Sequence, residues 1–365
     1  MQIAVALQHQ LHSSLPQSIP ASKLDDYERT IQPTEILQPS TIAVENNNLR
    51  HKAQSLTCLS AKVNKGIRDN SNGIRKVSSY TLYLSKAGRI LRPMSQENLR
   101  LLRPADLGGA VELSRLANWN QTIDDWEMLL RLDPQGCFAI EVDGQIVSTT
   151  TLLCYGKRLA WIGMVLTRPE YRRRGFAKRL MQAALELASD LKIESIKLDA
   201  TADGQPLYEK LGLKTEQVIE RWFRDGQSTI TPAQPTLRAV PPPLEMDREA
   251  FGADRAMLLQ QLASRNPPDS TGEAYNFSRN GARCQYLGPC VARNQKSART
   301  VIAHTLQSSP QSSWYWDLLS SNQNAIDLAA EFGFAPQRRL ERMALGDSIT
   351  KNDQMVYAIA GFELG

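Results

Sequence analysis

The sequence is poor in the residues that hold metal ions and disulfide bonds. Its 365 residues include only four histidines and five cysteines, with no CxxC pair and no HExxH motif. Zinc is usually held by closely spaced cysteine and histidine pairs, so we predict no metal site. The odd number of scattered cysteines suits a reducing compartment, and we expect a cytoplasmic protein without a disulfide framework.

Long apolar runs and a general basic bias are also missing. No apolar run approaches the roughly 18 residues of a membrane-spanning helix, which argues against an integral membrane protein. The net charge of +5 arises in residues 1–93, which carry 12 Lys and Arg against 6 Asp and Glu, while the rest carries 31 against 32. We therefore expect neither nucleic acid nor a membrane surface as a partner.

Phenylalanine and tryptophan are absent from residues 1–93, a segment rich in Ser, Gln and Asn. Such a composition buries too little apolar surface to offset the conformational entropy that folding costs. We expect residues 1–93 to be a disordered tail, or an over-extended start ahead of Met94, with no part in the chemistry.

From Leu99 onward the hydrophobic pattern predicts alternating strands and helices. We predict strands at 99–104, 137–142, 145–155, 159–167 and 195–201, and helices at 105–117, 122–132, from near Gly175, and within 203–213. Asp143-Gly144 is a tight-turn pair between the second and third strands. The pattern indicates an α/β protein with a mixed sheet.

A basic loop joins the strand that ends at Thr167 to the long helix that begins near Gly175. Backbone N–H groups at a helix N-terminus bind anions, and glycine lets the backbone approach a phosphate closely. Positive charge comes from Arg172, Arg173, Arg174 and Lys178. The loop is therefore a candidate pyrophosphate cradle; the alternative is a loop whose arginines are simply solvated.

The sequence around this loop resembles the GNAT family of N-acetyltransferases. Arg172-x-x-Gly175-x-Ala177 matches the family's Q/R-x-x-G-x-G/A motif, with Ala177 where many members have glycine. Thr167-x-Pro169-x-Tyr171 before the loop, and Tyr208 followed by Gly212 after it, fit the same pattern. The resemblance covers about residues 100–224.

The resemblance implies acetyl-CoA as a co-substrate. By position, the backbone of Val165, Leu166 and Thr167 would hold the pantetheine arm and polarise the thioester carbonyl. The pyrophosphate would bind the loop residues Arg172, Arg173, Arg174, Gly175, Phe176, Ala177 and Lys178. Tyr208 would protonate the leaving thiolate as general acid; alternatively, it is an ordinary half-buried aromatic residue.

A second folded half follows a proline-rich linker, and it aligns with the first at an offset of 121 residues. Gly212 pairs with Gly333, and Glu220-Arg221 pairs with Glu341-Arg342, which indicates an internal duplication. The expected boundaries are 94–228 for an intact GNAT domain, 229–243 for the linker and 244–365 for a degenerate GNAT-like domain. The expected fold is therefore α/β (α+β), with tandem GNAT-like mixed sheets flanked by helices.

The chemistry of the first copy is missing from the second. Gly175 aligns with Lys296 and Tyr208 with Ala329, so we expect no pyrophosphate site there. The second half also resembles the C-terminal domain of bacterial YitH/HolE-type acetyltransferases, through FGADR (251–255), RNGARCQYLGP (279–289) and GFAPQRRLERMALG (333–346). That resemblance implies a domain that shapes the acceptor side. Trp314 and Trp316 share one face of a predicted strand, as core residues or as the lining of a pocket.

Three functions are compatible with these patterns. The leading prediction is an acetyl-CoA-dependent N-acetyltransferase with a small-molecule amine as acceptor. The others are a non-catalytic acyl-CoA-binding or partner-interaction module, and an acetyltransferase acting on protein N-termini or lysines. Neither Cys137 nor Cys154 has a histidine nearby in sequence, which favours direct attack by the amine over an acetyl-cysteine intermediate.

Acceptor selection is predicted to involve the first two helices. These helices carry Trp119, Asp124, Asp125 and Glu127, and carboxylates there would attract a cationic amine. The alternative is a solvated acidic helix start that the helix dipole stabilises.

Overall fold

The computed structural model describes residues 59–66, 77–84, 90–91, 96–226, 237 and 241–365, and the chain divides into two units, 1–94 and 95–365. In the first unit, β1 (Leu59–Gly66), β2 (Val77–Leu84) and β3 (Ile90–Leu91) form a small antiparallel sheet. The remainder of the expected tail lies outside the described residues. The expectation that residues 1–93 form a disordered tail or an over-extended start therefore stays a prediction. The three described strands lie within this segment.

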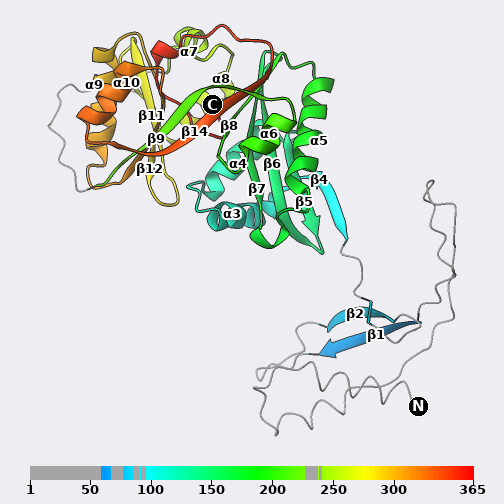
Figure 1. The fold of residues 1–365 in the computed structure, drawn as a ribbon. Helices are drawn as coiled ribbons and strands as arrows, with labels where there is room; N and C mark the ends of the chain where they lie inside the picture. Colours follow the sequence, from blue (N-terminus) through cyan, green and yellow to red (C-terminus); the bar gives the residue numbers. More distant parts are fainter. Residues whose placement is uncertain (1–58, 67–76, 85–89, 92–95, 227–236, 238–240) are drawn as a thin grey trace. The chain divides into compact units, whose positions relative to one another are not determined.

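One mixed sheet runs through both halves of the second unit (Figure 1). The first half contributes β4 (Glu97–Leu101), β5 (Cys137–Val142), β6 (Gln145–Tyr155), β7 (Leu159–Thr167), β8 (Ser195–Ala200) and β9 (Lys214–Arg224). The second half contributes β10 (Asp269–Ser270), β11 (Ala274–Arg279), β12 (Gln285–Ala292), β13 (Trp314–Leu319), β14 (Ala335–Gly346) and β15 (Val356–Ala358). The order is β10-β11-β12-β13-β9-β14-β8-β7-β6-β5-β4, with β15 paired to β12.

The last long strand of each half crosses into the other half. β9 lies between β13 and β14, and β14 lies between β9 and β8, with every one of these pairings antiparallel. The two strands are the ones that the offset of 121 residues aligns, so the duplication is visible as an exchange of equivalent strands. Separating the halves would break ladders along both strands, which makes the two domains one structural unit.

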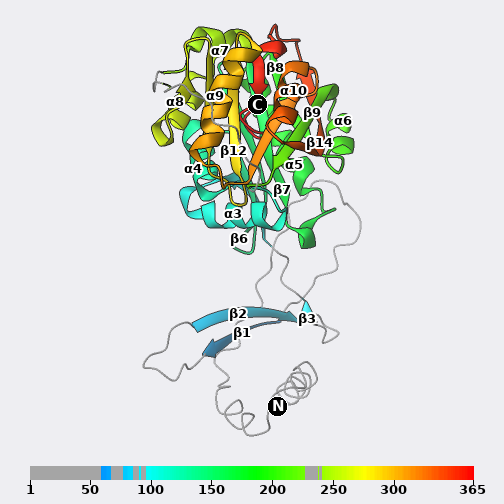
Figure 2. The same cartoon turned by 90° about the vertical axis from the view of Figure 1, so that its left-hand side faces the viewer.

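Helices cover both faces of the sheet. On one face lie α5 (Phe176–Asp190), α6 (Gln205–Lys210), α9 (Gln295–Ser308) and α10 (Gln323–Glu331), whose apolar sides form separate cores for the two halves. On the other lie α3 (Leu107–Leu116), α4 (Ile123–Leu132), α7 (Leu244–Phe251) and α8 (Ala256–Arg265), which share one core that spans both halves. Figure 2 shows α4, α7 and α8 to one side of the sheet and α5, α6 and α10 to the other.

Local sequence signals account for many of the element boundaries. Thr122 caps α4, where its hydroxyl accepts a hydrogen bond from the Asp125 amide while the Asp125 carboxylate accepts one from the Thr122 amide. Gly252 ends α7 in the left-handed conformation and so breaks the apolar run that continues into α8. Trp314 and Trp316 are core residues, 1% and 0% exposed. The predicted fold class, with tandem mixed sheets and flanking helices, is confirmed.

Candidate donor and acceptor sites

β7 and β8 run side by side for three residues and then separate. They pair in parallel through Leu159–Trp161 and Ser195–Lys197. From Ile162 to Thr167, the edge of β7 that faces β8 pairs with no strand of the described chain. Alternate backbone groups of residues 165–167 therefore face an opening instead of a neighbouring strand. This is the segment that the GNAT resemblance implies would hold the pantetheine arm.

A β-bulge shapes β7 at the same place. Met164 and Val165 together lie opposite Thr150 of β6, and Met164 adopts a positive φ of 51°. The Thr149 hydroxyl donates to the Met164 carbonyl at 2.9 Å, and the Ser148 hydroxyl donates to the Leu166 carbonyl at 2.7 Å. These buried hydroxyls hold the bulge, and our sequence reasoning missed them. The available signal was the polar run 148–151 inside an otherwise apolar strand.

The basic loop joins α5 at a position whose backbone conformation favours glycine. Gly175 is the N-cap of α5 at φ 81°, and a Cβ built there would meet no atom within 4 Å. The first turn of α5 has no side-chain cap and no acidic residue, so its leading N–H groups remain available to an anion. Phe176 is buried in the core and anchors the turn, while Arg172, Arg173, Arg174 and Lys178 are exposed around it.

Tyr208 lies in the core between α6 and the two diverging strands. It is 7% exposed and belongs to the same apolar cluster as Ile162 of β7 and Ala200 of β8, against which Val165 also packs. Burial raises the pKa of its phenol above the ordinary value of about 10. The hydroxyl is thus protonated at neutral pH, which is the state a proton donor needs.

The corresponding opening of the second half is filled by the chain itself. β12 and β13 pair in parallel through only three residues, 285–287 with 314–316, as β7 and β8 do. Beyond that point β15 pairs with β12, and the Ile359 amide donates to the carbonyl of Asp317 on β13. Asn294 caps α9 by accepting from the Ser297 amide, so that helix start is also satisfied internally. The sequence predicts that the second half lacks a pyrophosphate site, because Lys296 and Ala329 replace the glycine and tyrosine of the first half. The pairing of β15 with β12 agrees with that prediction.

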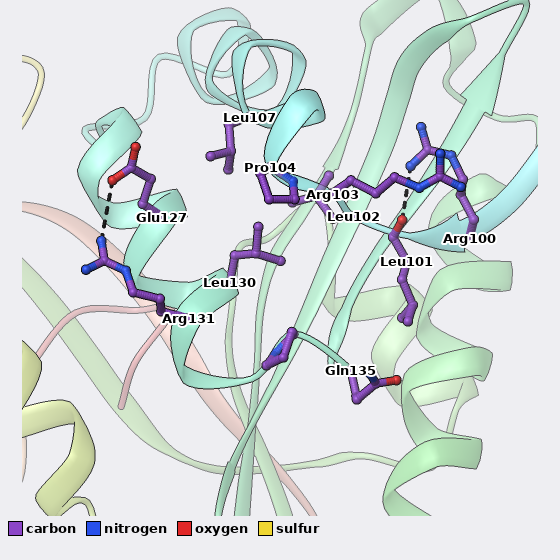
Figure 3. Close-up of a pocket in the computed structure, with 11 residues that line it drawn as sticks. Arg100, Leu101, Leu102, Arg103, Pro104, Leu107, Glu127, Leu130, Arg131 and Gln135 are labelled. Atoms are coloured by element: carbon purple, nitrogen blue, oxygen red, sulfur yellow. Dashed lines mark hydrogen bonds and ion pairs between the residues drawn. The ribbon is translucent and has the colours of Figure 1, made fainter.

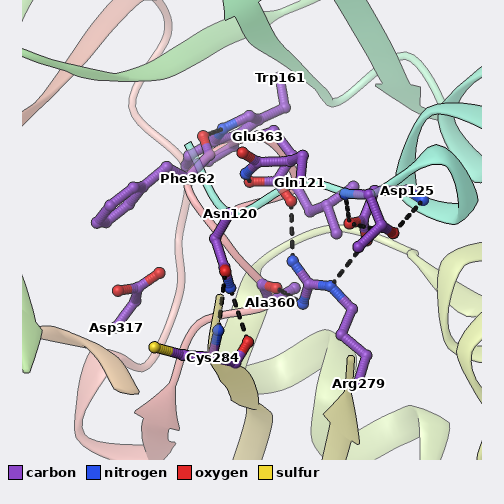
Figure 4. A network of polar contacts seen from close by, with 12 residues as sticks. Asn120, Gln121, Asp125, Trp161, Arg279, Cys284, Asp317, Ala360, Phe362 and Glu363 are labelled. Atoms are coloured by element: carbon purple, nitrogen blue, oxygen red, sulfur yellow. Dashed lines mark hydrogen bonds and ion pairs between the residues drawn. The ribbon is translucent and has the colours of Figure 1, made fainter. Parts of the chain in front are cut away.

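On the face opposite α5 and α6, the second half closes over the loop between α3 and α4. The Asn120 side chain accepts from the amides of Arg283 and Cys284 and donates to the Cys284 carbonyl at 2.9 Å. Asp125 accepts from Arg279 at 3.1 Å, and the same guanidinium donates to Glu363 at 2.8 Å (Figure 4). Three segments that are distant in sequence therefore meet at one buried polar cluster beside β7.

Of the acidic and aromatic residues proposed for acceptor selection, the structure brings one to this cluster. Asp125 is 1% exposed and points into it. Asp124 is exposed, and Glu127 pairs with Arg131 on the outer side of α4 at 3.4 Å. Trp119 is half-buried and packs against the shared core.

Two equivalent ion pairs lock the exchanged strands on this face. Arg221 of β9 donates through Nε and Nη2 to Asp317 of β13 at 2.7 and 2.6 Å. Arg342 of β14 donates in the same two-pronged way to Asp199 of β8 at 2.8 and 3.0 Å. The arginines are the pair that the 121-residue offset aligns, so the duplicated Glu-Arg dipeptide marks the contact between the halves.

We expect Asp317→Asn to lower the free energy of unfolding by about 3 kcal/mol, because it leaves the buried Arg221 without its counter-charge. The measurement is urea unfolding of the full chain at an unchanged m-value. Glu331→Gln is the matched control, since it removes one carboxylate from the half-exposed pair with Arg299 and should cost about 1 kcal/mol or less. Equal losses of stability from the two substitutions would contradict the conclusion that the pair of Arg221 and Asp317 holds the two halves together.

A groove of about 1000 Å³ lies at the outer edge of the sheet and does not belong to either site (Figure 3). It is lined by residues of β4, α3, α4 and the segment before β5, and β4 is three strands away from β7. Two of its arginines are paired, Arg100 with Asp106 and Glu141, and Arg131 with Glu127. The exposed Arg103 also lines it.

Within the described residues, no group of three or more His, Cys, Asp and Glu is arranged to hold a metal ion. In that same part of the chain, no helix is both long and apolar enough to cross a membrane.

The tandem α/β fold, in which β7 and β8 separate after three paired residues, and the sequence profiles that the chain matches together define a class of protein, a tandem acyltransferase. Residues 105–213 match the sequence profile of the acetyltransferase (GNAT) family, and residues 244–358 match that of a further acetyltransferase (GNAT) domain. The chain therefore belongs to the GNAT family, carries two of its domains, and is an acyltransferase enzyme.

Individual relatives agree with this assignment. The chain is 28% identical to the uncharacterized N-acetyltransferase YitH of Bacillus subtilis over 259 residues, which is 65% of this chain and 88% of that protein. It is 23% identical to the holothin acyltransferase of a Pseudoalteromonas species over 310 residues, 80% of this chain and 99% of that one. The fold is shared with a Pyrococcus horikoshii protein assigned to the acetyltransferases, at a TM-score of 0.67 and 23% identity, over 74% of this chain and 96% of that one. The predicted YitH/HolE-type resemblance is confirmed.

Proposed function

We propose that the protein is an acetyl-CoA-dependent N-acetyltransferase that transfers the acetyl group directly to a small-molecule amine. The observation that carries this proposal is the difference between the two copies. In the described chain, the edge of β7 lacks a strand neighbour beyond Trp161, whereas β15 fills the equivalent edge of β12. One donor site, with a second domain that supports the acceptor side, accounts for this asymmetry.

The residues of the first half fit the donor. The start of α5 offers uncapped N–H groups, open space at Gly175 and surrounding positive charge to a pyrophosphate. The free edge of β7 offers backbone hydrogen bonds to an extended amide-containing arm, as a neighbouring strand would receive them. Acetyl-CoA supplies the activated acetyl thioester. The backbone of residues 165–167 orients it, and Tyr208 donates its proton to the departing sulfur.

Direct transfer is supported by the state of the cysteines. Burial raises the pKa of the Cys137 and Cys154 thiols to about 12, and the charge of Asp133 adds to the effect. A thiol becomes a good nucleophile only as thiolate, which is scarce at neutral pH when the pKa is that high. An acetyl-cysteine intermediate on either residue is therefore disfavoured.

A small acceptor is supported by the way the second half covers the first. The contacts between Asn120 and Cys284 close the loop between α3 and α4 against β12, on the face from which an acceptor would approach β7. A peptide or protein substrate would need an open groove along this face. The partner-module alternative gives no role to the uncapped start of α5 or to a protonated Tyr208 beside the opening.

The experiment is release of free thiol from acetyl-CoA by the full chain, with n-propylamine, 1,3-diaminopropane or a lysine-containing peptide as acceptor. We expect thiol release that depends on both protein and a small amine, and little with the peptide. Acetyl-CoA binding without turnover of any acceptor would support the binding module instead. Turnover of the peptide alone would support a protein acetyltransferase.

A further inference from the structure

The buried cluster beside β7 holds more negative than positive charge. Asp125 and Glu363, both 2% exposed by side chain, share the single guanidinium of Arg279. The positive charge of Arg221 also stabilises the Glu363 carboxylate, but Arg221 already forms an ion pair with Asp317. Within the described residues, one carboxylate thus lacks a full counter-charge, and an unpaired charge in such a place is costly.

Unpartnered polar atoms surround the same carboxylate. The Gln121 amide donates to Glu363 at 2.9 Å, while its own carbonyl oxygen is buried with no partner in the described chain. The hydroxyl of Tyr286 is likewise buried without a partner there, and the ring of Tyr286 lies 4.1 Å from the Arg279 guanidinium carbon. Buried polar atoms are nearly always hydrogen-bonded, so both atoms point to a missing donor.

The turn that carries Glu363 touches β7 next to the donor site. A Cβ at Gly163 would lie only 2.8 Å from the Glu363 Cα, so the close approach depends on glycine in β7. The Trp161 indole donates to the Phe362 carbonyl at 2.9 Å, which fixes the turn on the strand. Gly163 precedes Val165 by two residues, or about 7 Å of strand. The turn that carries Glu363 therefore lies against the strand whose residues 165–167 are proposed to hold the thioester.

We propose that Glu363 and Gln121, with Asp125 and Tyr286 around them, form the binding site for the ammonium group of a small cationic acceptor. Glu363 takes the first proton from that ammonium group. This inference rests on the proposed function and names the substrate class of that site. An ammonium supplies the missing positive charge and three N–H donors, which match the Glu363 carboxylate, the Gln121 carbonyl oxygen and the Tyr286 hydroxyl.

The proton transfers balance. The ammonium gives one proton to Glu363, and the neutral amine forms the C–N bond with the acetyl carbon as the C–S bond breaks. The nitrogen loses its second proton as the amide forms. The departing sulfur receives the Tyr208 proton, and the proton from nitrogen replaces it on Tyr208 through solvent. Glu363 then returns its proton to solvent, leaving acetylated amine, free thiol and one proton. Burial raises the pKa of Glu363, which makes it a better proton acceptor than an exposed carboxylate.

The test is Glu363→Gln in the full chain, with acetyl-CoA and n-propylamine or 1,3-diaminopropane as probes. We expect kcat/KM for the amine to fall about 100-fold, with most of the change in KM, while the Kd for acetyl-CoA stays within about threefold. Glu331→Gln is the matched control, since it removes a half-exposed carboxylate that pairs with Arg299 and belongs to neither site, and it should leave both constants unchanged.

A second variant covers the case in which Glu363→Gln unfolds. Gln121→Leu keeps both carboxylates and removes only the amide, and we expect about a tenfold rise in KM for the amine with acetyl-CoA binding intact. Unchanged amine kinetics in whichever of these variants folds would overturn the inference, as would equal losses of amine and acetyl-CoA affinity, which indicate a purely structural interlock. If wild-type protein binds acetyl-CoA but turns over neither amine, the proposed ammonium-binding site is wrong and the proposed donor site stands. If it does not bind acetyl-CoA, both proposals fall.

Discussion

Gly175→Asp should weaken acetyl-CoA binding by at least about 100-fold. The Cβ at this position projects into open space at the start of α5, so an aspartate would place a negative charge where the pyrophosphate is expected to bind. The helix N-terminus would be satisfied by the new carboxylate and would no longer attract a phosphate. Isothermal titration of the full chain with acetyl-CoA measures the effect directly.

Two controls separate charge from backbone strain in this experiment. Asparagine has nearly the same shape as aspartate and tolerates the left-handed conformation equally well. Gly175→Asn should therefore raise the Kd for acetyl-CoA less than about tenfold. Gly156→Asp introduces the same charge at another open, positive-φ glycine, in the turn that precedes β7, and should leave the Kd unchanged. Equal affinities for Gly175→Asp and Gly175→Asn would remove the pyrophosphate assignment.

Tyr208→Phe should lower kcat about 100-fold and leave the Kd for acetyl-CoA nearly intact. General acid catalysis typically contributes a factor of this size, and phenylalanine preserves the packing of the ring among β7, β8 and α6. Because the pKa of Tyr208 is raised, the phenol stays protonated as the pH rises. The wild-type pH–rate profile should therefore show no loss of activity from this group below about pH 10.

Tyr357→Phe is the control for the loss of a buried hydroxyl. Tyr357 lies on β15 in the core of the second half, away from the opening in the first, and its substitution should leave kcat unchanged. A change of less than threefold in kcat for Tyr208→Phe would show that Tyr208 is a packing residue only.

The elements that carry the proposed donor site could be predicted from the sequence because they are local. The strand from Leu159 to Thr167, the basic loop and the helix start at Phe176 are continuous in the chain, and each carries its own pattern of alternation, charge or glycine. The hairpin through Asp143-Gly144 was predictable for the same reason. Local chemistry fixes these features before any long-range packing is considered.

The buried polar cluster of the proposed acceptor site could not be predicted because no local pattern marks it. Gln121 and Asp125, Arg279, and Glu363 come from three segments that are separated by up to 242 residues. Only the sheet topology, with β9 and β14 exchanged, brings them together. The filling of the second opening by β15 was equally hidden, since a strand of three residues carries too short a pattern to recognise.

The duplication was visible in sequence, but its meaning was not. Glu220-Arg221 and Glu341-Arg342 aligned as a repeat, and the structure shows that their arginines reach across to Asp317 and Asp199 of the opposite copies. The repeat that marks common ancestry of the halves is thus also the contact that holds them together. The second domain therefore completes the shared sheet of the molecule.

The most direct test of this account is the number of acetyl-CoA molecules that one full-length chain binds, measured by isothermal titration. The account predicts one, because β7 keeps a free edge beside an uncapped α5 while β15 and Asn294 occupy the equivalent positions in the second half. Two bound molecules would contradict the assignment of the second half as a supporting domain. None, in a protein shown to be folded, would contradict the donor site itself.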